Sequence, residues 1–129
     1  MADQPETLFA VAQSLEKQGD WAGAADQYRA VLAAQSDFLE AHHNLTIALR
    51  HLDQTDEALL YARSAAEIAP DHPTVQFSLG VSLEHEKEIE AAIEAYKKSV
   101  DLRPNYVTAR NNLGRLLESP VKYLNRSNI

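Results

Sequence analysis

The feature that most constrains how this chain folds is one spacing that recurs along it. Ala24, Ala58 and Ala92 follow one another at intervals of 34 residues, and we call this interval the period. Positions of other physical character follow the same period, once or several times over: Val11, Leu45, Leu79 and Leu113; Leu15, Leu49, Leu83 and Leu117; Gly80 and Gly114; Pro70 and Pro104; and, across two periods, Tyr28 and Tyr96. Because small, apolar, turn-forming and aromatic residues share one period, the spacing indicates a structural unit that is repeated along the chain.

Within each period, the apolar residues follow the rhythm of a pair of α-helices. Leu45, Leu49 and Leu52 stand at i, i+4 and i+7, which places them on one stripe of a helix. A second stripe, made of alanines, follows them and stops before Pro70, which lacks a backbone donor and clashes with the preceding turn. We therefore expect helices at about 5–18, 21–35, 39–52, 55–69, 73–86, 89–103 and 107–118. Small residues allow two helix backbones to approach, so contact points are expected early in the second helices, at Ala24, Ala58 and Ala92, and on first helices at Gly80 and Gly114.

The composition is that of an ordinary globular protein, with 45% hydrophobic and 24% charged residues in a chain of 129. Twelve Lys and Arg against 19 Asp and Glu leave a net charge of −7, which disfavours a nucleic-acid backbone or a membrane surface as the main partner. The start, MADQPETLF, lacks the basic segment and apolar run of a secretory leader. We therefore expect a soluble, cytoplasmic protein, and the lack of cysteine excludes disulfides and thiolate chemistry.

With these landmarks, the chain resembles the tetratricopeptide repeat proteins, whose unit has the same period. The third period matches the family pattern best, through Leu79, Gly80, Leu83, Ala92, Tyr96 and Pro104. The resemblance implies an all-α fold, a right-handed superhelical solenoid of antiparallel helix pairs. In this register the chain has an N-terminal lead at 1–4, repeats at 5–38, 39–72 and 73–106, the first helix of an incomplete fourth repeat at 107–118 acting as a cap, and a tail at 119–129. The second repeat departs from the pattern at Thr46, Asp53 and Ala62. These departures predict looser packing around the middle repeat.

In this family the first helix of each repeat lines a concave groove, so the resemblance implies a scaffold or adaptor that binds a partner peptide or helix. Carried over by position, the partner-binding groove residues are Phe9, Gln13, His43, Asn44, Ile47, His51, Phe77, Val81, His85, Asn112 and Arg115. Arg50, Ser78, Glu84 and Asn111 also stand at groove positions. An apolar floor is predicted from Phe9, Ile47, Phe77 and Val81, with Asn44, Asn112 and Arg115 holding the backbone or a carboxylate of the peptide. Alternatively, the two phenylalanines pack between neighbouring first helices, and the asparagines belong to the repeat pattern.

One specific partner class is disfavoured by the same comparison. Family members that grip the acidic C-terminal tails of chaperones use basic residues and asparagines at fixed groove positions. Those positions hold Phe9, Gln13, Asn44, Thr74 and Ser78 in this sequence. Since only Asn44 matches, we expect no clamp for a chaperone tail.

The sequence offers little for metal or catalytic chemistry. His43 and His51 lie two turns apart on one predicted helix, which separates them by about 12 Å, too far to share a metal ion. A run of carboxylates at Glu84, Glu86, Glu88 and Glu90 spreads around a helix end, as a solvated surface would. No phosphate loop or nucleophile motif is present, so we predict no enzyme activity, no cofactor and no metal. Trp21, the sole tryptophan, is predicted to pack at a helix start.

Two further functions remain open at this stage. The chain can be the N-terminal, substrate-targeting repeat region of a larger enzyme, such as a glycosyltransferase, or a self-assembling repeat module. In the tail, Tyr123 stands where the family often has an aromatic residue at the start of the second helix. Arg126 stands at the position of Ala24, Ala58 and Ala92 in the earlier repeats, and close helix packing cannot continue through an arginine. We therefore predict at most a short turn at 121–125. The last helix would then expose an apolar face with Leu113, Leu116 and Leu117, and a homo-oligomer would form through this uncapped C-terminal face.

Overall fold

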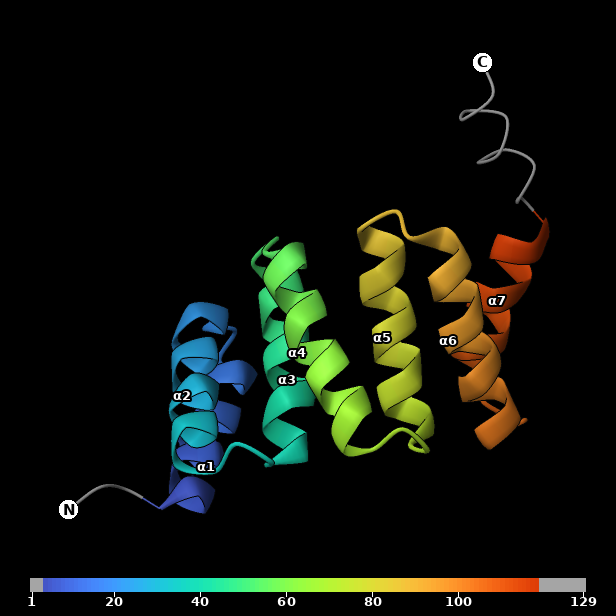
Figure 1. The fold of residues 1–129 in the computed structure, drawn as a ribbon. Coiled ribbons are helices and arrows are strands. Elements are labelled where there is room, and N and C mark those ends of the chain that lie inside the picture. The colour runs from blue at the N-terminus through green and yellow to red at the C-terminus, as the bar shows by residue number, and fades with distance from the viewer. Residues whose placement is uncertain (1–3, 119–129) are drawn as a thin grey trace. The chain divides into compact units, whose positions relative to one another are not determined.

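The computed structural model describes residues 4–118, and this part of the chain consists of α-helices joined by short turns, with no strand (Figure 1). Its helices are α1 (Pro5–Lys17), α2 (Trp21–Ala34), α3 (Leu39–His51), α4 (Thr55–Ile68), α5 (Pro73–His85), α6 (Ile89–Leu102) and α7 (Val107–Glu118). Each helix begins and ends within one residue of the range expected from the sequence. The predicted conformation of the tail, with Tyr123 and Arg126, lies outside the described residues.

The chain divides into two compact units, Met1–Pro70 and Asp71–Ile129. In the first unit, α1 packs on α2, α2 on α3, and α3 on α4. In the second unit, α5 packs on α6, and α6 on α7. Within each unit, a helix therefore contacts its neighbour in sequence, which is the local packing that a short-period repeat predicts.

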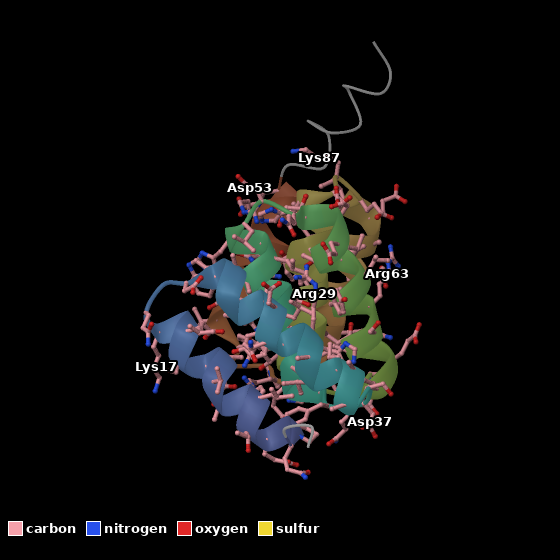
Figure 2. The ribbon with its side chains drawn as sticks, turned by 90° about the vertical axis from the view of Figure 1, so that its left-hand side faces the viewer. Lys17, Arg29, Asp37, Asp53, Arg63 and Lys87 are labelled. Carbon is pink, nitrogen blue, oxygen red and sulfur yellow. The ribbon has the colours of Figure 1, made fainter. Side chains whose placement is uncertain are left out.

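The turns inside the three helix pairs share one backbone geometry. Gly19, Asp53 and Lys87, which stand one period apart, all have a left-handed backbone, with φ of 80°, 60° and 65°. The amide of the next residue then donates to the carbonyl of a leucine five residues back, Leu15, Leu49 or Leu83, at 2.9 Å in every case. This is the hydrogen bond of a Schellman motif, and it ends α1, α3 and α5 at equivalent positions. Asp53 and Lys87, both labelled in Figure 2, occupy a conformation that glycine adopts at lower cost.

The small residues near the starts of the even-numbered helices mark the closest helix contacts. Ala24, Ala58 and Ala92 are all 0% exposed, as expected of positions where helices approach each other. Gly80 is a contact point as well, because a Cβ placed there would lie 2.6 Å from the ring of Tyr96. The same expectation is wrong for Gly114 within residues 4–118, since nothing there comes within 4 Å of such a Cβ. No described helix follows α7 to supply a ring like that of Tyr96.

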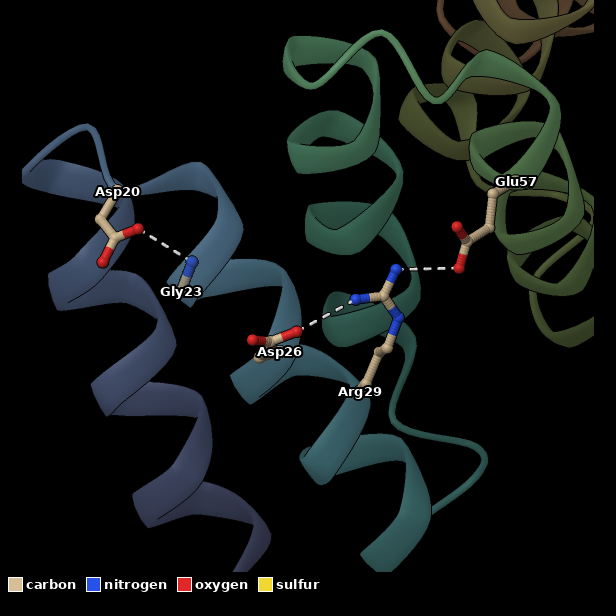
Figure 3. Close-up of polar contacts among 5 residues, drawn as sticks. All are labelled: Asp20, Gly23, Asp26, Arg29 and Glu57. Atoms are coloured by element: carbon tan, nitrogen blue, oxygen red, sulfur yellow. Dashed lines mark hydrogen bonds and ion pairs between the residues drawn. The ribbon is translucent and has the colours of Figure 1, made fainter.

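Polar contacts fix the start of α2 and join α2 to α4 within the first unit (Figure 3). The side chain of Asp20 accepts a hydrogen bond from the Gly23 amide at 2.9 Å, which caps the helix N-terminus. Further along α2, the guanidinium of Arg29 contacts Asp26 at 3.3 Å and Glu57, on α4, at 2.9 Å. Arg29 and Glu57 are partly exposed, so this ion pair contributes at most about 1 kcal/mol.

The middle helix pair, α3 and α4, is closed at the positions where the sequence departs from the family pattern. Thr46 is 0% exposed and Ala62 is 2% exposed. The hydroxyl of Thr46 donates to the backbone carbonyl of His42 at 2.8 Å, so its burial leaves no unsatisfied donor. Neither position therefore opens to solvent. The contact between α3 and α4 is nevertheless less extensive than that between α1 and α2 or between α5 and α6, in the direction of the looser packing predicted for the middle repeat.

The last helix is covered more fully than expected along one side. Ala109 and Leu116, seven residues apart on α7, are both 0% exposed, which identifies the buried stripe of the helix that packs on α6. The prediction that Leu116 lies on a half-covered face is therefore wrong. Leu113 is half-buried beside this stripe, whereas Leu117 remains 48% exposed.

Candidate functional site

The predicted groove residues all lie on odd-numbered helices. In the first unit, α1 carries Phe9 and Gln13, and α3 carries His43, Asn44, Ile47 and His51. In the second unit, α5 carries Phe77, Val81 and His85, and α7 carries Asn112 and Arg115. None of these side chains is fully buried, and Gln13, His51, His85 and Arg115 are exposed. We refer to the positions in each unit as the binding face of that unit.

The two phenylalanines on these faces pack against other aromatic rings of their own units. Phe9 stacks on Phe38 at 5.0 Å between ring centroids and contacts Tyr28 at 5.7 Å. Phe77, two periods later, contacts Tyr106 at 5.2 Å and Tyr96 at 5.9 Å. Such ring pairs contribute about 0.5–1.5 kcal/mol beyond the area they bury. Both phenylalanines therefore support the fold, whatever they also offer to a ligand.

The asparagines of the binding faces interact with the buried tyrosines. The Tyr96 hydroxyl donates to Glu84 at 3.0 Å and accepts from the Asn112 amide at 3.4 Å. Burial, assisted by the nearby Glu84 carboxylate, raises the pKa of Tyr96 above its usual range, so the hydroxyl remains a donor.

The first unit contains the same arrangement, two periods earlier in the sequence. The Tyr28 hydroxyl donates to Glu16 at 2.9 Å. Asn44 lies near enough to this hydroxyl to offset part of the rise in its pKa. Burial and the Glu16 carboxylate raise the pKa of Tyr28 as well. Asn44 and Asn112 thus link a binding face to a buried tyrosine, which gives both a structural role beside the predicted contact with a peptide.

His51 is engaged by the sole tryptophan. The rings of His51 and Trp21 are parallel within 4°, and their centroids lie 3.8 Å apart. This stack joins the end of α3 to the start of α2 within the first unit. Trp21 therefore packs at a helix start, as predicted, and its ring borders the binding face.

The second unit contains a cavity of about 360 Å³ beside its binding face, with polar and charged walls. It is lined by Val81, Glu84, His85, Lys87, Tyr96, Asn112 and Arg115. Five of these residues were predicted from the sequence to form the groove, namely Val81, Glu84, His85, Asn112 and Arg115. The structure thus brings α5 and α7 residues to one cavity, as the register of neighbouring first helices implies.

An ion pair on the cavity wall joins α5 to α7. The Arg115 guanidinium donates to the two carboxylate oxygens of Glu84 at 2.6 and 2.9 Å. The hydrogen bond from Arg115 holds the pKa of Glu84 below its usual range, against the opposing effect of burial, and the bond from Tyr96 adds to it.

Lys87 and the ion pair of Glu84 are features of the cavity that the sequence did not predict. Glu84 was placed in the groove by position but also in a solvated run of carboxylates, whereas its side chain is only 20% exposed and is paired. A usable signal was present, because Glu84 and Arg115 are separated by nearly one period and carry opposite charges on neighbouring first helices.

Neither a cluster of metal ligands nor a membrane-spanning helix occurs in the described part of the chain. Among residues 4–118, no three His, Cys, Asp or Glu side chains come together as metal ligands would. Over the same range, no helix combines the length and the apolar character needed to cross a bilayer.

Comparisons with known families agree with the geometry of the helix pairs. A family model described as tetratricopeptide repeat matches residues 9–73, and a second, described as TPR repeat, matches residues 86–119. The first match alone covers half of the chain. The protein therefore belongs to the tetratricopeptide repeat family. Among curated protein sequences, none matches this chain.

Solved structures share the fold at low sequence identity. The first TPR domain of Spaghetti (RPAP3), bound to the HSP90 peptide SRMEEVD, superposes with a TM-score of 0.88 at 19% identity over 94% of this chain and 96% of that one. MamA from Desulfovibrio magneticus RS-1 has a TM-score of 0.86 at 23% identity, over 97% of this chain and 71% of that one. A mutant O-GlcNAc transferase of Thermobaculum terrenum has a TM-score of 0.79 at 24% identity, over 88% of this chain and 22% of that one. The predicted fold class, an all-α tetratricopeptide repeat solenoid, is confirmed.

Proposed function

We infer that this chain is a protein-interaction module whose binding faces hold a peptide or helix of a partner protein. The observation that carries this inference is the contrast between helices: the predicted groove residues remain accessible on the odd-numbered helices, whereas the alanine contact points of the even-numbered helices are fully buried. Membership of the tetratricopeptide repeat family supports the same function, and one similar fold, that of RPAP3, was solved with a bound peptide.

The proposed contacts differ in kind between residues. Ile47 and Val81 are half-buried aliphatic side chains on α3 and α5. They are the best candidates to bury apolar atoms of a ligand, at about 1.5–3 kcal/mol for one large side chain. His51, His85 and Arg115 are exposed and supply polar contacts at the edges. Only Asn44 matches among the clamp positions for a chaperone tail, so we do not propose that this chain binds the peptide that RPAP3 binds.

A displayed peptide library tests this function without knowledge of the natural partner. The wild-type chain is expected to enrich peptides with a shared sequence pattern, and Ile47→Glu combined with Val81→Glu is expected to abolish the enrichment. The control is Leu60→Glu, on α4, because Leu60 is 65% exposed and lies on no binding face. Circular dichroism melts show whether each variant is folded. Enrichment that survives in the folded double variant contradicts the proposed binding faces.

A second candidate function is substrate targeting within a larger enzyme. The supporting observation is that this fold covers 22% of an O-GlcNAc transferase chain, so comparable repeats occur as one part of an enzyme. We propose no catalytic role for the repeats themselves. Sequencing of the full-length transcript tests this candidate, since a catalytic domain in the same reading frame would support it.

Self-association is a third candidate. Val107 and Leu117 on α7 are 65% and 48% exposed, and apolar side chains of this size favour contact with a second copy. Sedimentation equilibrium over a concentration series decides this, because a strict monomer at high concentration contradicts it. A cytoplasmic location and the exclusion of nucleic acid remain predictions from the composition, resting on the net charge of −7.

A further inference from the structure

Lys87 breaks a local rule in the turn between α5 and α6. The equivalent turns use Gly19 and Asp53, and both glycine and aspartate adopt a left-handed backbone more readily than lysine does. Residues held in such a conformation against their preference are concentrated at functional sites. The position of Lys87 is therefore a reason to look for a function of its side chain.

Lys87, an exposed residue of the turn, lines the cavity in the second unit together with Arg115 and His85. Within residues 4–118, its ammonium group forms no hydrogen bond and no ion pair. Arg115 is oriented at the same wall by two hydrogen bonds to Glu84. Since Glu84 contributes one negative charge against the two cations, the charged residues that line the cavity have a net charge of +1, in a chain of net charge −7.

We propose that this cavity binds the carboxylate side chain of an Asp or Glu in the partner peptide, with Lys87 as the cation that recognises it. This inference rests on the proposed function, because it assigns one side chain of the peptide that the binding face holds. Asn112, on the same wall, supplies an amide donor, and Val81 contacts the aliphatic part of the incoming side chain.

The charge and the size of the cavity favour a carboxylate over other groups. One carboxylate balances a net charge of +1, whereas a phosphorylated side chain, with about −1.5 to −2 at neutral pH, would overbalance it. A volume of about 360 Å³ accommodates a side chain of this length together with water. Arg115 is held by Glu84 before the ligand arrives, so little ordering of the guanidinium is required on binding.

The test uses the same peptide library, displayed with free N-termini so that every carboxylate it offers is that of a side chain. The wild-type chain is expected to select peptides with Asp or Glu at one fixed position. For a selected peptide, replacing that acidic residue by its amide should weaken binding about tenfold in fluorescence anisotropy. In Lys87→Gly, the acidic and amide peptides are expected to bind equally well.

Lys87→Gly removes the ammonium while placing glycine in the left-handed turn, so loss of the fold is not expected to obscure the result. The matched control is Lys98→Ala, which makes the same change in net charge at an exposed position of α6 away from the cavity. The control should retain the tenfold preference. Selected peptides without an acidic position, or a preference that survives in Lys87→Gly, would overturn the assignment and leave the binding function intact. A wild-type chain that selects no peptide would overturn both.

Discussion

The helix pairs α3–α4 and α5–α6 fill the same internal position in opposite ways. In α5–α6, Gly80 leaves a gap that the ring of Tyr96 fills, with a would-be Cβ only 2.6 Å from the ring. In α3–α4, the residues one period earlier are Thr46 and Ala62, a larger residue on the first helix and a smaller one on the second. All four positions are buried. We propose that volume has been exchanged between the facing helices, while all four positions stay closed to solvent.

This comparison shows that a departure from a repeat pattern has to be evaluated in pairs. Thr46 alone suggests crowding, and Ala62 alone suggests a void. Their changes in volume have opposite signs, although threonine and alanine together fill less space than glycine and tyrosine, and a change on one helix is felt by the residue that faces it. The second difference between the pairs is polar: the Tyr96 hydroxyl is tied to Glu84, whereas α3–α4 has Arg50 and Ala62 at those positions.

The largest effect is expected from removing the ring in α5–α6. Tyr96→Ala leaves a cavity beside Gly80 and removes the bond to Glu84, so it should lower the free energy of unfolding by about 3–5 kcal/mol. Urea denaturation followed by circular dichroism measures this. Tyr61→Ala, at a half-buried tyrosine of α4, is the control and should cost less. Equal losses for the two variants would show that Gly80 and Tyr96 are not a specially fitted pair.

A double-mutant cycle sharpens the comparison further. Gly80→Thr alone forces a side chain into the Tyr96 ring and should cost about 1–3 kcal/mol. Gly80→Thr combined with Tyr96→Ala reproduces the residues of α3–α4, so the double variant should be more stable than the sum of the single losses predicts. We expect a coupling energy of at least about 0.5 kcal/mol, measured by urea denaturation of all four proteins. Strict additivity would contradict the proposed exchange of volume.

The sequence predicted what depends on periodicity and could not predict what depends on side-chain reach. The helix limits and the burial of Ala24, Ala58 and Ala92 follow from residue spacing, and they were predicted correctly. Leu116 was misassigned because a stripe of leucines does not show which side of α7 faces α6. The ion pair between Glu84 and Arg115 was missed because both side chains are long, and the period places their backbones without fixing where their charged ends meet.

The ion pair between Glu84 and Arg115 has no equivalent beside Tyr28 in the first unit. The residue two periods before Arg115 is Ile47, which cannot pair with a carboxylate. Glu84→Gln should lower stability at pH 7 by about 1 kcal/mol, a modest value because Arg115 is half exposed and solvent screens the pair. The control is Glu90→Gln, at an exposed position of α6, which should change stability little at pH 7.

The pH dependence of the same variant follows from the lowered pKa of folded Glu84. A carboxyl group whose pKa is depressed by folding contributes stability above its unfolded pKa, about 4.3, and loses that contribution as the pH falls through the folded value. The difference between wild type and Glu84→Gln should therefore shrink as the pH is lowered from 6 toward 3, in urea denaturation at each pH. A difference that stays constant over this range would show that the pair does not depend on the charge of Glu84.

The smallest expected effects concern the turns, where the two helix pairs also differ. Asp53→Gly and Lys87→Gly each place glycine in a left-handed conformation, and the relief of strain should exceed the added entropy of the unfolded chain, for a gain of about 0.5–1 kcal/mol. The gain should be larger at Lys87, because aspartate tolerates this conformation better than lysine does. The control is the reverse change, Gly19→Ala, which should lower stability by about 1 kcal/mol although nothing lies within 4 Å of the added Cβ. If Lys87→Gly instead lowers the urea midpoint, the lysine side chain stabilises the turn, and its backbone conformation is then no sign of a function in binding.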